Sequence, residues 1–174
     1  MPIAHCSEQH DCAQVAAHAK AILKIVVGKD EVREIGELPE GKYKWGGAIA
    51  GANGDVYCFP SDTERVLKVS CQAGVAESEQ VSLIGPDFPG KNKWQNGFLG
   101  RDGAVYGLPC NAPAVLRISE KGEVTTLAIP GGAEESVGEE KWEGGVMAPS
   151  GVIYAMPQQS QRVLRIDPGP AVTS

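Results

Sequence analysis

Hydrophobic and polar positions along this chain follow a pattern that repeats about every 49 residues. Each repeat has a tryptophan, a short apolar segment, a turn dipeptide, a second apolar segment that ends at a proline, and an alternating third segment. The tryptophans are Trp45, Trp94 and Trp142, with spacings of 49 and 48 residues. The same spacing separates Tyr57, Tyr106 and Tyr154, and also Pro60, Pro109 and Pro157. One structural unit is therefore used several times.

Each repeat is predicted to supply short antiparallel strands. The first strand covers Ala48–Ala50, Gly97–Leu99 and Gly145–Met147, the second starts at Val56, Val105 and Ile153, and the third covers Val66–Val69, Val115–Ile118 and Val163–Ile166. A weaker fourth strand is predicted at Val81–Ile84 and Val124–Ile129. Lys68, Arg117 and Arg165 take the polar position of the alternating third strand. Four short antiparallel strands in about 50 residues are typical of a β-propeller blade.

A turn dipeptide separates the first two strands of every repeat. The dipeptides are Asn53-Gly54, Asp102-Gly103 and Ser150-Gly151. They predict a two-residue hairpin turn in which both residues have positive φ. The second strand is expected to stop at its proline, because proline cannot donate a hydrogen bond to a central ladder.

The start of the chain carries only part of the pattern. Ile22–Ile25 matches Val66–Val69, and Val32–Leu38 stands where a fourth strand belongs. We therefore expect an all-β propeller-type domain over 21–168, made of a half-blade (21–40) and blades over 41–88, 89–131 and 132–168, with a tail over 169–174. Residues 1–20 lie outside this repeat as an irregular segment or a short helix. Such a helix would be capped by Asp11 and run through Ala13, Ala16, Ala17 and Ala19.

Three blades are fewer than the 4–8 that close a propeller, and soluble proteins avoid exposed sheet edges. Two copies could join head to tail into a six-bladed homodimer in which each half-blade completes the partner's last blade. Alternatively, the chain is part of a longer array, or its edges dock on a partner protein. Both alternatives stay open at this point.

Composition changes the picture mainly by exclusion. Glycine (22) and proline (12) together make nearly a fifth of the 174 residues, against roughly 12% in average usage, which argues against a helical bundle. No apolar run approaches the ~18–20 residues of a membrane span, and Val15–Val27, interrupted by lysines, makes a poor signal peptide. A net charge of −6 offers no basic field for nucleic acid. Five cysteines without framework spacing suit a reducing compartment, so the expected location is intracellular, cytoplasmic by default, with an organelle left open.

The pattern G-x-V-Y…P…V-L-R-I, followed by Gly122-Glu123-Val124-Thr125-Thr126, resembles the blades of streptogramin-lyase-like propellers and of the gluconolactonase-like and NHL groups. The resemblance covers residues 22–167 and implies a fold. Kelch repeats are a weaker analogy, because Trp45 precedes Gly46-Gly47 instead of following the tyrosine. The lyase family uses His and Glu side chains that project into the ring. Here all three histidines precede the first full repeat, so no catalytic residue carries over.

The repeated Lys-Trp pair is the main candidate for function. Its members are Lys44, Trp45, Lys93, Trp94, Lys141 and Trp142. Because the first strand of a blade lines the central channel, the lysines could form a positive ring that binds an acidic peptide or a small anion. Alternatively, each tryptophan fills the wedge between blades and the lysine stem packs over an indole.

Other motifs are interpreted as structural. The cluster of His5, Cys6, His10, Cys12 and His18 matches no standard zinc spacing, so no metal site and no cofactor is predicted. Gly36-x4-Gly41-Lys42 and Gly85-x4-Gly90-Lys91 look like phosphate loops but lack the Ser/Thr that binds magnesium, and they are interpreted as loops between blades. Glu134-Glu135 and Glu139-Glu140 are interpreted as a solvated charge run.

The predicted function is a non-catalytic binding or scaffold module for a protein or a small anionic ligand. The alternative is a metal-dependent propeller enzyme of lactonase or lyase type, for which Asn96 or Asp102 could be proposed as ligands. Asp102 is better explained by its turn, and the separation of the histidines from the repeats leaves no credible catalytic triad. Cys58 is interpreted as a small buried hydrophobic residue.

Overall fold

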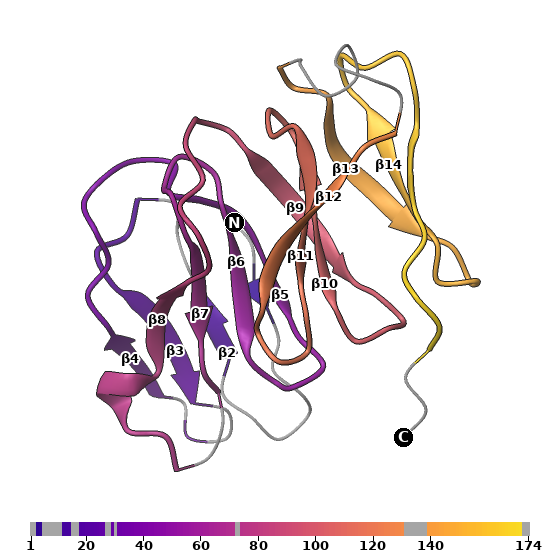
Figure 1. The fold of residues 1–174 in the computed structure, drawn as a ribbon. Coiled ribbons are helices and arrows are strands. Elements are labelled where there is room, and N and C mark those ends of the chain that lie inside the picture. The colour runs from indigo at the N-terminus through magenta and orange to yellow at the C-terminus, as the bar shows by residue number, and fades with distance from the viewer. Residues whose placement is uncertain are drawn as a thin grey trace.

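The computed structural model describes residues 3–4, 12–14, 18–26, 29, 31–71, 74–130 and 139–171. Within these ranges the chain is all-β, and its only helical element is the 3-10 turn η1 (Glu77–Glu79). Narrow antiparallel sheets follow one another along the chain and are fanned side by side (Figure 1). This is the arrangement of consecutive propeller blades, which confirms the predicted fold class.

Four blades are present in the described part of the chain. The first contains β1 (Ile3–Ala4), β2 (Cys12–Gln14), β3 (Ile22–Val26) and β4 (Glu31–Ile35), and the second contains β5 (Trp45–Ala50), β6 (Val56–Pro60), β7 (Val66–Val69) and β8 (Val81–Ile84). The third contains β9 (Trp94–Leu99), β10 (Val105–Pro109), β11 (Ala114–Ile118) and β12 (Val124–Ala128), and the fourth contains β13 (Trp142–Met147), β14 (Ile153–Pro157) and β15 (Leu164–Ile166). A parallel bridge between Gly46 and Gln95 joins the inner strands β5 and β9.

The first blade corrects the prediction for the N-terminal segment. β1 pairs with β2, and β2 pairs with β3, so this sheet has four strands where a half-blade was expected. The helix predicted through Ala13 is wrong at Cys12–Gln14, which is a strand, and Ala16 and Ala17 lie outside the described residues. The edge of β3 offers unpaired backbone groups, and pairing with them outweighs the helix propensity of alanine.

The hairpin turns also differ from the prediction. In the second blade the amide of Gly51 donates to the carbonyl of Asp55, so the loop has three residues instead of two. Of the turn residues, only the glycine takes a positive φ, which is 81° at Gly54. The side chain of Asn53 accepts a hydrogen bond from the amide of Asp55, at 3.1 Å. The dipeptide is therefore selected by this side-chain bond and by one left-handed glycine.

The apolar core lies between the blades. Alternate residues of β6 face opposite neighbours: Val56 and Cys58 belong to a buried cluster shared with the first blade, whereas Tyr57 and Phe59 belong to one shared with the third. A third cluster joins the third and fourth blades. Each interior blade therefore has two buried faces, which explains why β6 and β10 are buried along their whole length.

Candidate functional site

The lysine of each Lys-Trp pair is buried, with exposed fractions of 1% for Lys44, 3% for Lys93 and 4% for Lys141. The Lys93 ammonium donates to the carbonyl oxygens of Ser61 (2.6 Å), Thr63 (2.9 Å) and Gly90 (2.8 Å). Ser61 and Thr63 lie after β6, in the preceding blade. Burial lowers the pKa of Lys93, while the negative charges of Asp62 and Glu64 raise it to a smaller extent. Lys93 thus connects the second and third blades.

The other two lysines make the equivalent connection. Lys141 donates to the carbonyl oxygen of Ala112 at 2.9 Å, and Ala112 stands at the repeat position of Thr63. Lys44 donates to the carbonyl oxygen of Ala19, which precedes β3 by the same spacing that separates Thr63 from β7. Burial lowers the pKa of both lysines. Every described Lys-Trp pair therefore ties its blade to the loop of the blade before it.

The three tryptophans have like surroundings. Each is buried, and its indole Nε1 donates to a carbonyl twenty residues further along the chain, at 3.1 Å for Trp45 and at 2.8 Å for Trp94 and Trp142. The ammonium of Lys44 lies 5.6 Å from the ring centroid of Trp45. This geometry supports the structural interpretation of the six candidate residues. Their role in binding an anionic ligand stays a prediction, and the exposed fraction of each of these three lysines is 4% or less.

A pocket of about 550 Å³ opens beside Lys44, between the loop that precedes β5 and the loops that flank β7 and β8. Its charged lining combines four carboxylates, Glu40, Asp62, Glu64 and Asp87, with three cations, Lys42, Lys44 and Arg65. One ion pair, from Arg65 to Asp87 at 2.5 Å, already uses two of these groups. The mixed charge gives this pocket no preference for anions.

The third blade contains a hydrogen-bonded cluster of three polar side chains, Asp102, Tyr106 and Arg117. The Tyr106 hydroxyl donates to Asp102 Oδ2 at 2.8 Å, and Arg117 donates to the same oxygen at 3.1 Å. Burial and the hydrogen bond to Asp102 raise the pKa of Tyr106, while the Arg117 guanidinium opposes this shift. Asp102, one of the two residues considered as metal ligands, is thus held by neighbours in its own blade.

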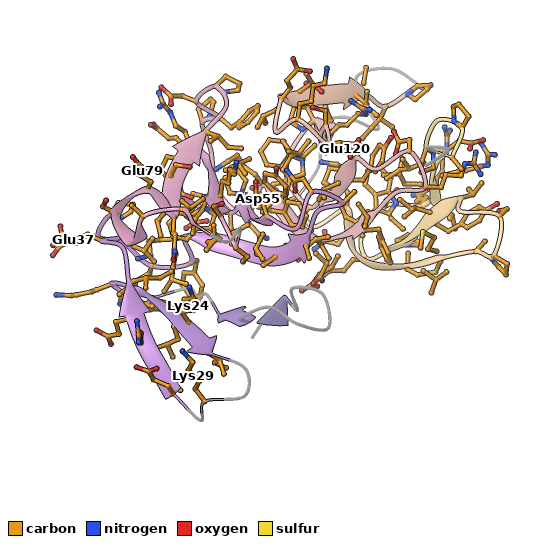
Figure 2. All side chains as sticks on the ribbon, turned by 90° about the horizontal axis from the view of Figure 1, so that it is seen from below. Lys24, Lys29, Glu37, Asp55, Glu79 and Glu120 are labelled. Atoms are coloured by element: carbon orange, nitrogen blue, oxygen red, sulfur yellow. The ribbon has the colours of Figure 1, made fainter. Side chains whose placement is uncertain are left out.

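The second blade places its carboxylate differently. Asp55, at the repeat position of Ala104 and Val152, is completely buried, and its Oδ2 lies 2.7 Å from the Lys68 ammonium. Its Oδ1 has no hydrogen-bond partner among the described residues. Asn53 donates to Asp55 Oδ2, to the Tyr57 hydroxyl and to the carbonyl of Glu120 in the third blade. Figure 2 shows Asp55 surrounded by side chains in the middle of the molecule, with Glu120 on the neighbouring blade.

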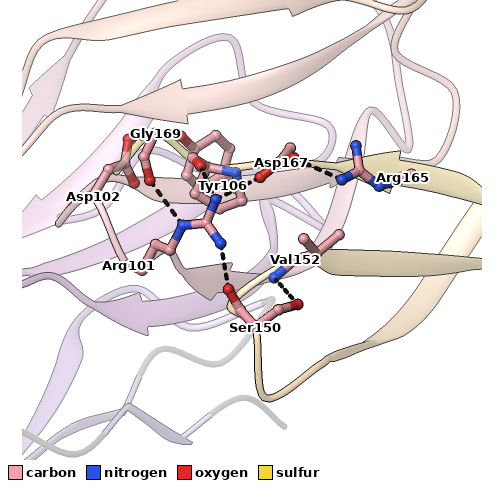
Figure 3. Close-up of polar contacts among 9 residues, drawn as sticks. Arg101, Asp102, Tyr106, Ser150, Val152, Arg165, Asp167 and Gly169 are labelled. Carbon is pink, nitrogen blue, oxygen red and sulfur yellow. Dashed lines mark hydrogen bonds and ion pairs between the residues drawn. The ribbon is translucent and has the colours of Figure 1, made fainter. Parts of the chain in front are cut away.

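Arg101 holds the segment after β15 against the third blade. Its guanidinium donates to the carbonyl oxygens of Gly169 (2.9 Å), Pro168 (2.9 Å) and Ser150, and to Asp167 Oδ1 (2.7 Å) (Figure 3). Hydrogen bonds from Arg165 and the nearby charge of Arg101 lower the pKa of Asp167. Ala52 and Pro149 occupy the repeat position of Arg101, so neither the second nor the fourth blade has this clamp.

The remaining candidates do not form a reactive centre in the described residues. His5, Cys6 and His10 lie outside these residues, whereas His18 packs edge-on against Tyr43, with ring centroids 4.8 Å apart. Asn96 donates to the carbonyl of Glu143 at 2.8 Å. The described ranges contain no group of three His, Cys, Asp or Glu side chains arranged to hold a metal. In the same ranges no helix is both long and apolar enough to span a membrane.

The two glycine-lysine motifs lie between strands of successive blades. Gly36 and Gly41 fall between β4 and β5, and Gly85 and Gly90 fall between β8 and β9. No helix follows either loop in the described structure, so neither has the strand–loop–helix context of a phosphate site. The interpretation as loops between blades is confirmed. Of the acidic pairs, Glu134-Glu135 lies outside the described residues.

Sequence reasoning missed an exposed face on the fourth blade. Pairing places Val146 opposite Tyr154, and Tyr154 opposite Arg165, so these side chains share one side of the sheet. Met156, two residues beyond Tyr154, lies on the same side and is 44% exposed, and Val163 is 52% exposed. We call Val146, Tyr154, Met156, Val163 and Arg165 the outward face. The signal was available in the repeat, because the positions equivalent to Val146, Tyr154, Met156 and Val163 carry apolar or aromatic side chains in the interior blades and have a blade to cover them.

Comparisons with known proteins support the fold alone. No family model and no curated protein matches the sequence. Among solved structures, the chain is similar to a virginiamycin B lyase from Staphylococcus aureus with quinupristin (TM-score 0.65, 19% identity, 95% of this chain and 55% of that one). It is also similar to a putative 6-phosphogluconolactonase from Bacteroides uniformis (0.62, 15%, 94% and 48%) and to an auxiliary nutrient binding protein from Bacteroides ovatus (0.63, 14%, 97% and 48%). The chain is therefore a partial β-propeller that spans about half the length of the structures it resembles.

Proposed function

We propose that this protein is a non-catalytic binding or scaffold module, and that it binds a protein partner through the outward face of its fourth blade. The observation that carries the proposal is the exposure of Met156 and Val163 at positions that are buried in both preceding blades. Phe59 and Leu108 are the equivalents of Met156, and each has an exposed fraction of 0%.

Three further observations support this function over a small-anion site. The lysines that would form a positive ring are buried against carbonyl groups. The pocket beside Lys44 has lining groups of both charges. An apolar face bordered by charged side chains is the usual signature of a protein-binding surface.

Affinity capture with a matched pair of variants tests the proposal. The immobilised chain is exposed to an extract of its native source, and the retained proteins are compared with those retained by a Met156→Asp/Val163→Asp variant. We expect the partner to be lost from the double variant, because a buried unpaired carboxylate opposes docking. A Thr126→Asp variant adds charge to an exposed position on β12 and should retain the partner. Identical retention by all three proteins would contradict the proposal.

A further inference from the structure

The interfaces between interior blades show which side chains cover the positions equivalent to the outward face. Tyr57, Phe59 and Val66 of the second blade form one buried cluster with Leu116 and Ile118 of the third. One blade further, Tyr106, Leu108 and Val115 are covered in the same way by Leu164 and Ile166 of the fourth. In these two interfaces the cover is a leucine and an isoleucine from the third strand of the next blade, and Leu67 and Val69 take the same positions where the second blade covers the first.

The first blade carries the same covering pair, and no described segment of the chain lies against it. Leu23 and Ile25 of β3 stand at the repeat positions of Leu116 and Ile118, and each is 38% exposed. Val32 of β4 lies opposite Ile25 in register and is 60% exposed. We call Leu23, Ile25, Val32 and Glu34 the first-blade face, since Glu34 pairs with Leu23.

We propose that the outward face of the fourth blade binds the first-blade face of a second copy of this chain, head to tail. This inference rests on the proposed function and names its partner. In the assembly, Leu23 and Ile25 of the second copy cover Tyr154, Met156 and Val163, as their equivalents do inside each chain. The polar groups are complementary too, because the outward face carries Arg165 and the first-blade face carries Glu34.

The contact joins two different surfaces, so it leaves one free face on each copy until the assembly closes. With four blades per chain, two copies supply eight blades, which lies within the 4–8 range of closed propellers. The first blade corrects the six-bladed ring predicted from three blades and a half-blade. The first blade has four strands of its own and so is not a half-blade, whereas the fourth blade has three described strands.

The mass of the purified chain in solution, measured by sedimentation over a range of concentrations, tests the inference. We expect twice the mass of the monomer for the wild type. Met156→Asp and Leu23→Asp should each weaken the association by about tenfold or more, since either one puts a carboxylate into the apolar contact. Thr126→Asp is the control and should assemble as the wild type does. Circular dichroism checks that the variants fold, which is expected because both changed side chains are partly exposed.

Cysteine cross-linking tests the head-to-tail direction. Met156→Cys and Leu23→Cys proteins are oxidised separately and as a mixture, with the wild type setting the background from the native cysteines. A cross-linked product that forms only in the mixture supports the proposed contact. A product from Met156→Cys alone would show a face-to-face contact and overturn it. A monomeric wild type at every concentration would also overturn it, and if variant-sensitive capture from the extract persisted, the proposed function would stand with another partner.

Discussion

Val115 and Val163 occupy the same position in consecutive blades, yet Val115 is 4% exposed and Val163 is 52% exposed. Their local sequences are alike, because each is the first residue of an alternating segment, Val115–Ile118 or Val163–Ile166, that ends in isoleucine. The difference comes from the fourth blade, which covers Val115, whereas no described segment covers Val163. In a repeat protein of this kind, the neighbouring unit decides whether a residue is buried. It therefore also decides most of the stability that the residue contributes.

The largest expected effect comes from the lysines that connect interior blades. Lys93→Ala removes the charged donor from three carbonyl groups, and a buried acceptor left unpaired, as that of Ser61 would be, costs about 1–3 kcal/mol. We expect the free energy of unfolding to fall by about 3 kcal/mol or more. Urea denaturation measures this loss, and the triple change of Lys44, Lys93 and Lys141 to alanine should prevent folding. A triple variant that melts as the wild type does, and has lost the capture of an acidic peptide, would restore the anion-binding interpretation.

Alkaline pH should destabilise the folded chain through a buried thiol of the second blade that the fourth blade lacks. Burial raises the pKa of the Cys58 thiol to about 12 from an ordinary value of 9.0, and alanine (Ala155) stands at its position in the fourth blade. Above pH 9 the unfolded chain loses this proton while the folded chain keeps it. The free energy of unfolding should therefore fall with rising pH, by about 1.4 kcal/mol per pH unit between 9 and 12. Cys58→Ala should remove this component of the slope, and equal slopes in both proteins would refute the assignment.

Matched valine truncations test the difference between the buried Val115 and the exposed Val163 directly. Val66→Ala and Val115→Ala remove buried methyl groups and should each cost about 2 kcal/mol. Val163→Ala should change the free energy of unfolding by less than about 0.5 kcal/mol. Unfolding is followed at a protein concentration low enough to dissociate any assembly. A loss at Val163 as large as that at Val115 would mean that the outward face is covered within the monomer.

Substitutions that give the second blade the residues of the third blade test the role of the buried Asp55 carboxylate. Asp55→Ala leaves Lys68 without its ion-pair partner and should cost about 1–2 kcal/mol, since Lys68 is partly exposed. Adding Asn53→Asp to this variant reproduces the third-blade arrangement, in which Asp102 serves Tyr106 and Arg117. We expect the double variant to recover at least half of the loss in thermal or urea denaturation. No recovery would show that the two arrangements are not interchangeable.

A small and mainly local effect is expected at the clamp formed by Arg101. Arg101→Ala removes bonds to partly exposed groups, so the global loss should stay below about 1 kcal/mol. Locally, residues 167–171 should lose their attachment to the third blade. Hydrogen exchange of the corresponding peptide should become faster while that of β10 stays unchanged. Unaltered exchange after Asp167 would contradict the clamp.

The sequence alone predicted most of β5 to β15, because alternation, turn dipeptides and terminal prolines are local signals repeated three times. It did not predict β1 and β2, because their pairing with β3 is a tertiary interaction that alanine-rich segments do not signal. The sequence did not predict the hydrogen-bond acceptors of Lys93 either, because they are main-chain carbonyls, which every residue has. Arg101 and Asp55 depart from the repeat, and such departures were the available clue to specialised contacts.

The chemistry of the lysine connections bears on how such a chain can lengthen. Each donor is a side chain, but each acceptor is a backbone oxygen, which every loop possesses whatever its residues. A duplicated segment that carries its own Lys-Trp pair would therefore find its acceptors ready in the preceding unit, with no compensating substitution there. Adding a repeat requires only that the loop of the preceding unit keeps its backbone conformation.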